Sequence, residues 1–341
     1  MSTVWFLLAV LCLVMYVVLD GYDLGIGIAT LFERDARSRR ELLELVAVAW
    51  DGNETWLVLL AVSLWAGFPL AFGTMLPQAY LPLIIMLFSL IVRGVSVEMA
   101  SQAETASKWE RLFGIASLAA ALAQGVVVGT LTEKLTVVNR AFSGSPFGAI
   151  SWYAVLTAAA VTCGYLALGY AYTKWKATGE LRASAGRRGT VSAVLASILA
   201  VACLAAVNGT AAPLNLQSPG RAIAFAGLLI FAAAGAVATL AALRSDSPRY
   251  DALPIAGLVT TTVALVIALV VARYPVLAPP ALTLADTAAP ESTLVFLAVG
   301  IGLNMPLVLY YNWFAHHTFK GKLSIAPHDL DVPDALPGSQ P

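Results

Sequence analysis

Two pairs of carboxylates interrupt the first two long apolar stretches of the chain, where acidic side chains are costly. Asp20 and Asp23 lie in the first stretch, and Asp51 and Glu54 lie in the second. An acid inside a membrane-spanning helix costs several kcal/mol unless it is paired, hydrated or protonated. The members of each pair are three residues apart and therefore share one helix face. Intramembrane carboxylates of this kind are typical of proton relays.

The spacing predicts that these acids meet a basic side chain inside the membrane. In a hairpin of the first two helices, Asp23 and Asp51 are each 14 residues from the middle of the connecting loop, and Asp20 and Glu54 are each 17. Across the next hairpin, Asp51 and Arg93 are each 21 residues from the middle of their loop. We therefore expect Asp23, Asp51 and Arg93 at one depth, with Arg93 as an ion partner of Asp51 or Asp23. The alternative is an arginine that extends to the membrane interface.

Composition predicts that the elements carrying these residues are membrane-spanning helices. Of the 341 residues, 59% are hydrophobic and only 12% are charged, whereas about 25% of a typical soluble domain is charged. The net charge is zero, which gives no reason to expect nucleic acid as a partner. The first apolar run lacks a basic N-terminal region and is too long for a signal peptide, so we expect a retained helix.

Nine apolar stretches are long enough to cross a bilayer, and short connections join them. They cover residues 3–32, 42–67, 76–99, 111–132, 147–174, 189–208, 221–243, 253–273 and 291–318. We expect a single transmembrane domain over 1–322 and a disordered cytoplasmic tail over 323–341. Gly21 and Gly25 predict a close helix approach. Asn304 and Pro306 predict a kink in the last helix.

Basic residues near the helix ends predict the orientation. One set of loops, with the segment after the last helix, carries 15 Lys and Arg residues, and the opposite set carries 4. Because cytoplasmic loops carry the excess of basic residues, we expect the N-terminus outside and the C-terminus in the cytoplasm.

The positions of the histidines argue against a haem site in this chain. His316, His317 and His328 lie at the end of the last apolar stretch and beyond it. A b-type haem needs axial ligands such as His or Met, and the scattered methionines are typical core residues. We expect neither a haem nor a metal site within this chain alone.

Three stretches of the sequence resemble the signatures of one protein family. They are Asp20-Gly-Tyr-Asp-Leu-Gly25, Trp50-Asp-Gly-Asn-Glu-Thr-Trp56 and Arg93-Gly-Val-Ser-Val-Glu98. In this order they are similar to subunit II of cytochrome bd-type quinol oxidases. The resemblance covers nearly the whole chain, although the fifth to seventh helices match only in hydropathy.

The resemblance implies an all-α fold of nine helices, arranged as two four-helix bundles plus one. It implies a complex in the bacterial cell (inner) membrane that oxidises menaquinol or ubiquinol and reduces dioxygen to water. Two haems b and one haem d would belong to the partner, subunit I, whose assembly this chain would support. Small single-helix subunits, lipids and a structural quinone would be further partners.

The resemblance also implies roles for individual residues. Asp51 resembles an acid that lines a proton route from the cytoplasm to the haem d site, and Trp56 lies where the family can have an oxygen-access passage. Asp23 resembles an acid near a lipid-like quinone, and Glu98 stands where other members carry an acid. The predicted site comprises Asp51 as proton relay, Asp23, Glu54, Asp20, Arg93 and Glu98.

Two alternatives stay open. A proton-coupled secondary transporter would also carry midplane carboxylates, although no matching pair of broken helices marks a second half. A purely structural scaffold would hold a haem subunit while Asp51 formed only an ion pair.

Overall fold

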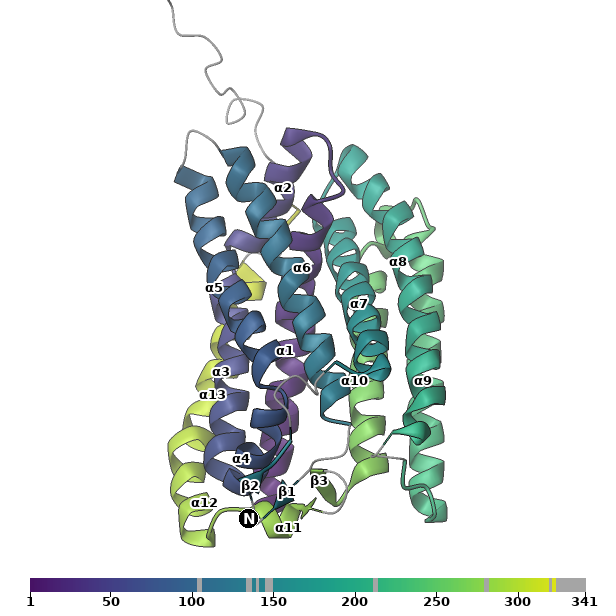
Figure 1. The fold of residues 1–341 in the computed structure, drawn as a ribbon. Coiled ribbons are helices and arrows are strands. Elements are labelled where there is room, and N and C mark those ends of the chain that lie inside the picture. Colours follow the sequence, from purple (N-terminus) through teal and green to yellow (C-terminus); the bar gives the residue numbers. More distant parts are fainter. Residues whose placement is uncertain are drawn as a thin grey trace, which may run out of the picture.

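The computed structural model describes residues 1–102, 106–132, 137–138, 141–144, 150–210, 214–278, 282–318 and 321–322. The long helices run side by side along the molecule (Figure 1). The first half forms α1 (Ser2–Thr30), α2 (Ala36–Ala47), α3 (Trp50–Gly67), α4 (Pro69–Gln78), α5 (Tyr80–Gln102) and α6 (Ala106–Thr130). The second half forms α7 (Trp152–Lys176), α8 (Gly179–Ala206), α9 (Pro219–Leu243), α10 (Leu253–Arg273), α11 (Leu284–Thr287), α12 (Glu291–Leu297) and α13 (Leu303–Thr318).

Four very short strands complete the regular structure and form two antiparallel pairs. These are β1 (Val137–Val138) with β2 (Ala141–Phe142), and β3 (Val276–Ala278) with β4 (Leu282–Thr283). Single turns of 3-10 helix follow α8 at Val207–Gly209 and precede α10 at Pro248–Tyr250. The expected tail over 323–341 lies outside the described residues.

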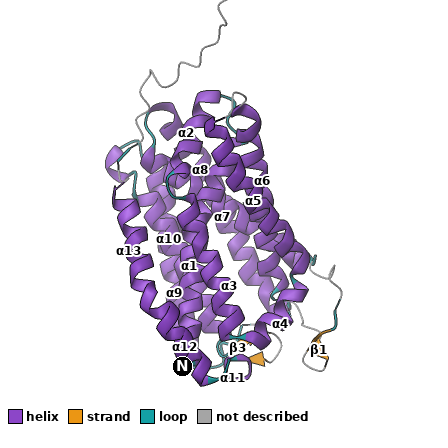
Figure 2. Ribbon diagram, turned by 90° about the vertical axis from the view of Figure 1, so that its left-hand side faces the viewer, coloured by secondary structure: helices purple, strands orange, loops and turns teal. Residues whose placement is uncertain are grey.

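The number and type of spans confirm an all-helical polytopic membrane protein. Among the described residues, eight helices are long and apolar enough to cross a membrane, and the bent pair α2–α3 brings the number to nine. The last span joins α12 to α13 through a π-helical turn over Ala298–Gly302. In the view turned by 90°, α2 lies at one end of the bundle, and α11, α12 and the N-terminus lie at the other (Figure 2).

The second span is not the uninterrupted helix that we expected over 42–67. It breaks at residues 48–49 into α2 and α3, which are bent by 51° relative to each other. The start of α2 has a clear cause, because Asp35 caps this helix and its side chain accepts a hydrogen bond from the Ser38 amide at 2.8 Å. Asp51 is therefore the second residue of α3 rather than part of a long helix.

The third span also begins differently from the prediction of 76–99. A separate helix, α4, precedes α5, with Pro69 in its first turn and Pro77 near its end. Pro69 suits a first turn because its missing N–H would have no partner there. The connection between α3 and α5 is thus a helix with its own direction, not a simple hairpin turn.

The last span is irregular, as expected, but the irregularity begins about one turn before Asn304 and Pro306, where we predicted a kink. The π-helical turn occupies Ala298–Gly302, and Pro306 lies inside α13. Proline cannot donate to the carbonyl four residues earlier, which is that of Gly302. The Asn304 side chain donates to the Gly300 carbonyl at 2.6 Å and satisfies one carbonyl of the irregular turn.

The centre of the bundle is the crossing of α1 and α7, where two glycines meet. A Cβ on Gly25 would lie 1.7 Å from the Tyr165 carbonyl oxygen, and one on Gly169 would lie 2.3 Å from the backbone of Gly25. A Cβ on Gly21 would lie 2.8 Å from the Tyr165 ring. The predicted close approach at Gly21 and Gly25 is confirmed, with α7 as the neighbour.

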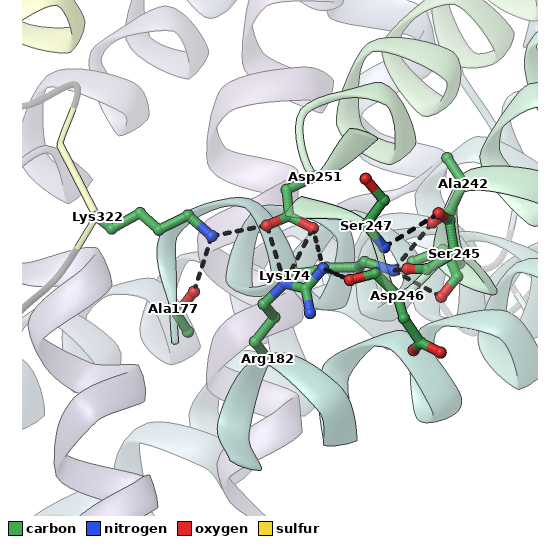
Figure 3. A network of polar contacts seen from close by, with 10 residues as sticks. Lys174, Ala177, Arg182, Ala242, Ser245, Asp246, Ser247, Asp251 and Lys322 are labelled. Atoms are coloured by element: carbon green, nitrogen blue, oxygen red, sulfur yellow. Dashed lines mark hydrogen bonds and ion pairs between the residues drawn. The ribbon is translucent and has the colours of Figure 1, made fainter. Parts of the chain in front are cut away.

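Buried charge fastens α7 to the ends of the neighbouring helices (Figure 3). Lys174 Nζ donates to the carbonyls of Ala242, Leu243 and Ser245 at 2.8–2.9 Å. Its three donors thus complete the C-terminal end of α9, where carbonyls lack helical partners. Asp251, at the start of α10, accepts from Arg182 of α8 and from Lys322 after the last helix.

At the opposite end of the bundle, α12 and the segment that precedes it contact α1 and the end of α3. The Trp5 indole donates to the Leu294 carbonyl at 2.8 Å, and the Ala289 amide donates to the Gly67 carbonyl at 2.9 Å. Trp5, Phe68 and Leu294 pack in one buried cluster. These contacts position the start of the last span against α1 and α3.

The α1–α7 crossing yields a direct test of packing. Gly25→Ala should destabilise the protein by at least the roughly 1–3 kcal/mol typical of overpacking, because backbone atoms of α7 occupy the space for the new methyl group. Gly164→Ala, on α7 with no heavy atom within 4 Å of the new Cβ, is the matched control and should not destabilise. Thermal unfolding of the purified protein measures both, and equal midpoints would contradict the crossing.

Candidate functional site

Arg93 is fully buried and binds two carboxylates from two other helices. Its Nη1 lies 2.6 Å from Asp20 Oδ1 on α1, and its Nη2 lies 2.8 Å from Glu54 Oε2 on α3. The side chains of Arg93 and Asp20 are at most 1% exposed, whereas that of Glu54 is 27% exposed. The planar guanidinium presents several donors in a fixed geometry, so that it can hold two acids at once. Arg93 therefore joins α1, α3 and α5 inside the membrane region.

The predicted partners of Arg93 were wrong, although the predicted layers were partly correct. We expected Asp51 or Asp23, but the ion pairs are to Asp20 and Glu54, the two acids placed in one layer by their spacing. The observed partners, Asp20 and Glu54, lie about one helical turn from the acids that we expected. The difference arises because α4 lies between α3 and α5, so that the hairpin has no single turning residue.

Asp23 is also fully buried but has a different environment. Its Oδ2 accepts a hydrogen bond from Asn53 Nδ2 at 2.8 Å, and the same amide nitrogen donates to the Tyr22 hydroxyl at 2.7 Å. The Tyr22 ring stacks on that of Tyr172 from α7, with centroids 4.2 Å apart. Sequence reasoning missed Asn53 and Tyr22 as site residues. The sequence does hold a signal for them, because each is a polar residue directly before an acid in an apolar stretch: Tyr22 precedes Asp23, and Asn53 precedes Glu54.

A second set of buried polar side chains lies nearby on α1, α6 and α7. Gln124 Nε2 donates to the Tyr16 hydroxyl at 2.6 Å, and its Oε1 accepts from the Tyr165 hydroxyl at 2.7 Å. Gln124 thereby links three helices.

Three acids line a groove on the outer face of α3 and α5. The groove has a volume of about 480 Å³ and is open on one side. It is lined by Trp50, Asp51, Glu54, Thr55, Val58, Leu90, Ile91, Gly94, Val95, Glu98 and Met99. Asp51 and Glu98 are exposed there, and none of the ion pairs of the described residues involves Asp51. Asp51 thus lies in the groove beside Glu54 and forms no ion pair with Arg93, one of the pairings that we expected.

Trp56 of α3 is fully buried and is not among the residues that line the groove. It packs with Cys12, Tyr16 and Met305. Its indole nitrogen has no hydrogen-bond partner among the described residues. The structure therefore places Trp56 between α1, α3 and α13, and its predicted role in oxygen access stays a prediction.

The environment of Asp23 bears on the predicted structural quinone. The Asp23 side chain has no exposed surface, so that a quinone cannot contact its carboxylate without a local rearrangement. Asp23 does not fit as a direct quinone ligand. A quinone site elsewhere near this part of α1 stays a prediction.

Taken together, the site has a buried part and an open part that share one residue. Asp20, Asp23 and Arg93 are enclosed, and Asp51 and Glu98 face the groove. Glu54 contacts Arg93 and also lines the groove. Ionisable groups in such a series can pass protons between a groove and an enclosed cluster.

The family described as cytochrome bd terminal oxidase subunit II matches residues 1–319 of the chain. A relative from Bacillus subtilis, named cytochrome bd ubiquinol oxidase subunit 2, is 30% identical over 59% of this chain and 62% of its own length. A relative from Escherichia coli, named cytochrome bd-I ubiquinol oxidase subunit 2, is 26% identical over 59% of this chain and 55% of its own length. The chain thus spans only about three fifths of the curated relatives that it matches.

A solved structure has the same fold. A chain in the bd oxidase structure from Geobacillus thermodenitrificans superimposes with a TM-score of 0.74, over 94% of this chain and 99% of that one. The sequence identity is 17%. The likeness therefore supports the arrangement of the helices.

The ion pairs of Arg93 predict a large effect on stability. Arg93→Gln leaves two carboxylates without their cation, and breaking a buried ion pair in this way costs about 3–5 kcal/mol. Arg37→Gln is the matched control, because Arg37 pairs with Glu41 on the exposed face of α2, where such pairs contribute about 0.3–0.5 kcal/mol. Thermal unfolding in detergent should separate the two variants. Equal effects would show that Arg93 is not the central cation.

Proposed function

Since the chain belongs to the family of cytochrome bd terminal oxidase subunit II, we propose that it is the subunit without haem in a membrane quinol oxidase that reduces dioxygen to water. The curated relatives are named as ubiquinol oxidase subunits, and for this chain the quinol is either ubiquinol or menaquinol. The reaction belongs to the assembled complex and not to this chain alone. The family match gives no support to the alternative of a secondary transporter.

The chain is a multi-pass protein of the bacterial inner membrane. Eight or nine described spans support this, as does the bacterial source of its relatives. The N-terminus faces outward and the C-terminus faces the cytoplasm in the orientation that we propose. The basic residues Arg37, Arg39 and Arg40 support it, because they lie in α2, at the end of the bundle opposite the N-terminus (Figure 1).

The haems belong to the partner, subunit I, with two haems b and one haem d. Support comes from the histidines, since His316 and His317 fall at the end of α13 and the third, His328, follows it in the sequence. Small single-helix subunits and lipids complete the complex that we propose.

The partner docks over the groove of α3 and α5. Three acids in an otherwise apolar groove support this, because an acid left against lipid costs several kcal/mol. The apolar walls include Ile91 and Val95, which are 62% and 49% exposed. A partner helix on these residues would enclose the acids and replace lipid with protein.

Within the assembled complex, Asp51 relays protons toward the oxygen-reducing haem. The observation that carries this proposal is Glu54, whose carboxylate contacts Arg93 while its exposed part lines the groove beside Asp51. Glu98 and Asp51 receive protons from the cytoplasmic side, and Arg93, with Asp20, holds Glu54 in place. Trp56 borders the oxygen passage. In the competing structural role, Asp51 would serve assembly only.

Docking at the groove predicts a selective loss of the partner. Val95→Trp fills the groove and should prevent copurification of the haem-bearing subunit, so that the purified chain lacks visible absorption bands. Ile230→Trp is the matched control on α9, where Ile230 is 70% exposed, and the complex should stay coloured. A coloured complex with Val95→Trp would place the partner elsewhere.

The relay predicts a catalytic defect in an intact complex. Asp51→Asn removes the ionisable group and should lower quinol oxidase turnover by about 10²-fold, the lower end of what a positioned proton-transfer group contributes. Haem content should stay normal. Asp246→Asn makes the same chemical change at an exposed position after α9 and should leave turnover unchanged.

Two other outcomes of the Asp51 experiment are informative. Loss of haem from Asp51→Asn would assign the residue a structural role. Unchanged turnover together with unchanged charge transfer across the membrane would exclude it from the proton route.

A further inference from the structure

Asp23 uses only one of its two carboxyl oxygens in contacts with the protein. Oδ2 accepts from the Asn53 amide at 2.8 Å, while Oδ1 is buried and has no partner among the described residues. The second hydrogen of that amide is taken by the Tyr22 hydroxyl, at 2.7 Å. Asn53 is itself only 1% exposed, so that its contacts are fixed by the surrounding helices.

The charges in the buried cluster do not balance. Asp20, Asp23 and Glu54 are acids, and the cation that the structure places among them is Arg93. Both of its ion pairs go to Asp20 and Glu54, and Asp23 forms none among the described residues. Ionisation of all three acids would therefore leave two uncompensated negative charges. An isolated buried carboxylate is so costly that the group takes up a proton instead.

We propose that Asp23 is a neutral carboxylic acid that stores a proton on Oδ1 during oxidase turnover, with Asn53 as the residue that positions it. Oδ2 must keep a lone pair for the Asn53 amide, so the proton belongs on Oδ1. There it turns an acceptor into a donor. The acid nearest to Asp23 in the sequence is Asp20, which lies one turn earlier on the same face of α1.

The chemistry of storage is limited to one bond. Release breaks the O–H bond at Oδ1 and leaves a carboxylate, and uptake restores that bond with one proton. No electron moves. The ring of Tyr172, stacked at 4.2 Å on Tyr22 with an angle of 3° between the planes, holds Tyr22 and through it the orientation of Asn53.

This inference rests on the proposed function, and two measurements on the purified complex separate the failure of one from the failure of the other. The first is thermal stability, which needs no turnover. Asp23→Asn keeps the size and neutrality of the acid, so the unfolding midpoint should change by less than the error of measurement. Asp20→Asn removes an ionised partner of Arg93 and should lower the midpoint clearly. Equal losses in both variants would show that Asp23 is ionised and overturn the proposal.

The second measurement is the infrared difference spectrum recorded on reduction of the complex. The wild type should show a band in the carbonyl-stretching region of protonated carboxylic acids that shifts in D2O. The band should disappear in Asp23→Asn and persist in Asp51→Asn. In Asn53→Leu it should move to higher frequency, because the carbonyl oxygen loses a hydrogen bond, whereas a merely structural role for Asn53 would leave it unmoved.

The remaining outcomes are equally decisive. Absence of the band in the wild type would overturn the proposal and would point to a bound cation in place of the proton. A band that survives Asp23→Asn, or vanishes in Asp51→Asn, would assign the proton to another acid. Where Asp23→Asn fails to assemble, Asp23→Glu retains an acid and must shift the band, and an unshifted band would overturn the proposal. Normal turnover of Asp51→Asn would reject the Asp51 relay without affecting these results.

Discussion

One buried guanidinium between two carboxylates sets the arrangement of the first three spans. Arg93 contacts Asp20 and Glu54 at 2.6 and 2.8 Å, from three different helices. Since a buried charge without a partner costs several kcal/mol, each of these helices is confined to the register in which its charge meets the others. A shift of α5 by one turn would move Arg93 by about 5.4 Å and break both ion pairs. The depth of the groove acids relative to the buried acids follows from this register.

The close packing of α1 on α7 is the second requirement, because it encloses the acids of α1. Gly25 and Gly169 let the two backbones meet, and Tyr165 and Tyr172 of α7 then lie against the same region of α1. Phenol groups there supply hydrogen-bonding partners and apolar ring surface together. Helix packing and the polar cluster thus depend on each other. Glycines alone would allow approach, and the polar groups select the face of α1 that is buried.

Much of this could be predicted from the sequence, and the exceptions have physical causes. Hydropathy identified the nine spans, since length and apolarity are local properties, and the equal spacing of Asp20 and Glu54 identified one true layer. The partner of Arg93 could not be derived, because it depends on the path of α4, a helix that turns the third span away from a simple hairpin. Asn53 and Tyr22 were missed because a neutral polar residue in a helix gives no sign of its partner until the neighbouring helix is placed. The break at residues 48–49 was missed because residues 42–47, the second half of α2, are mostly apolar and continue the hydropathy pattern of α3.

In the proton relay that we propose, the enclosed acids and the groove acids respond to each other's charge. A proton that enters the groove changes the charge on Glu54 or Asp51, and Glu54 is held by the same cation that holds Asp20. Neutralisation of Glu54 frees one arm of Arg93, whose field then acts on the acids that remain ionised. In an interior of low effective dielectric, charges a few ångströms apart interact by several kcal/mol. The groove and the buried acids are therefore coupled through Arg93 even where no proton passes directly between them. In the relay that we propose, this coupling makes the fixed position of Arg93 a requirement for function as well as for the fold.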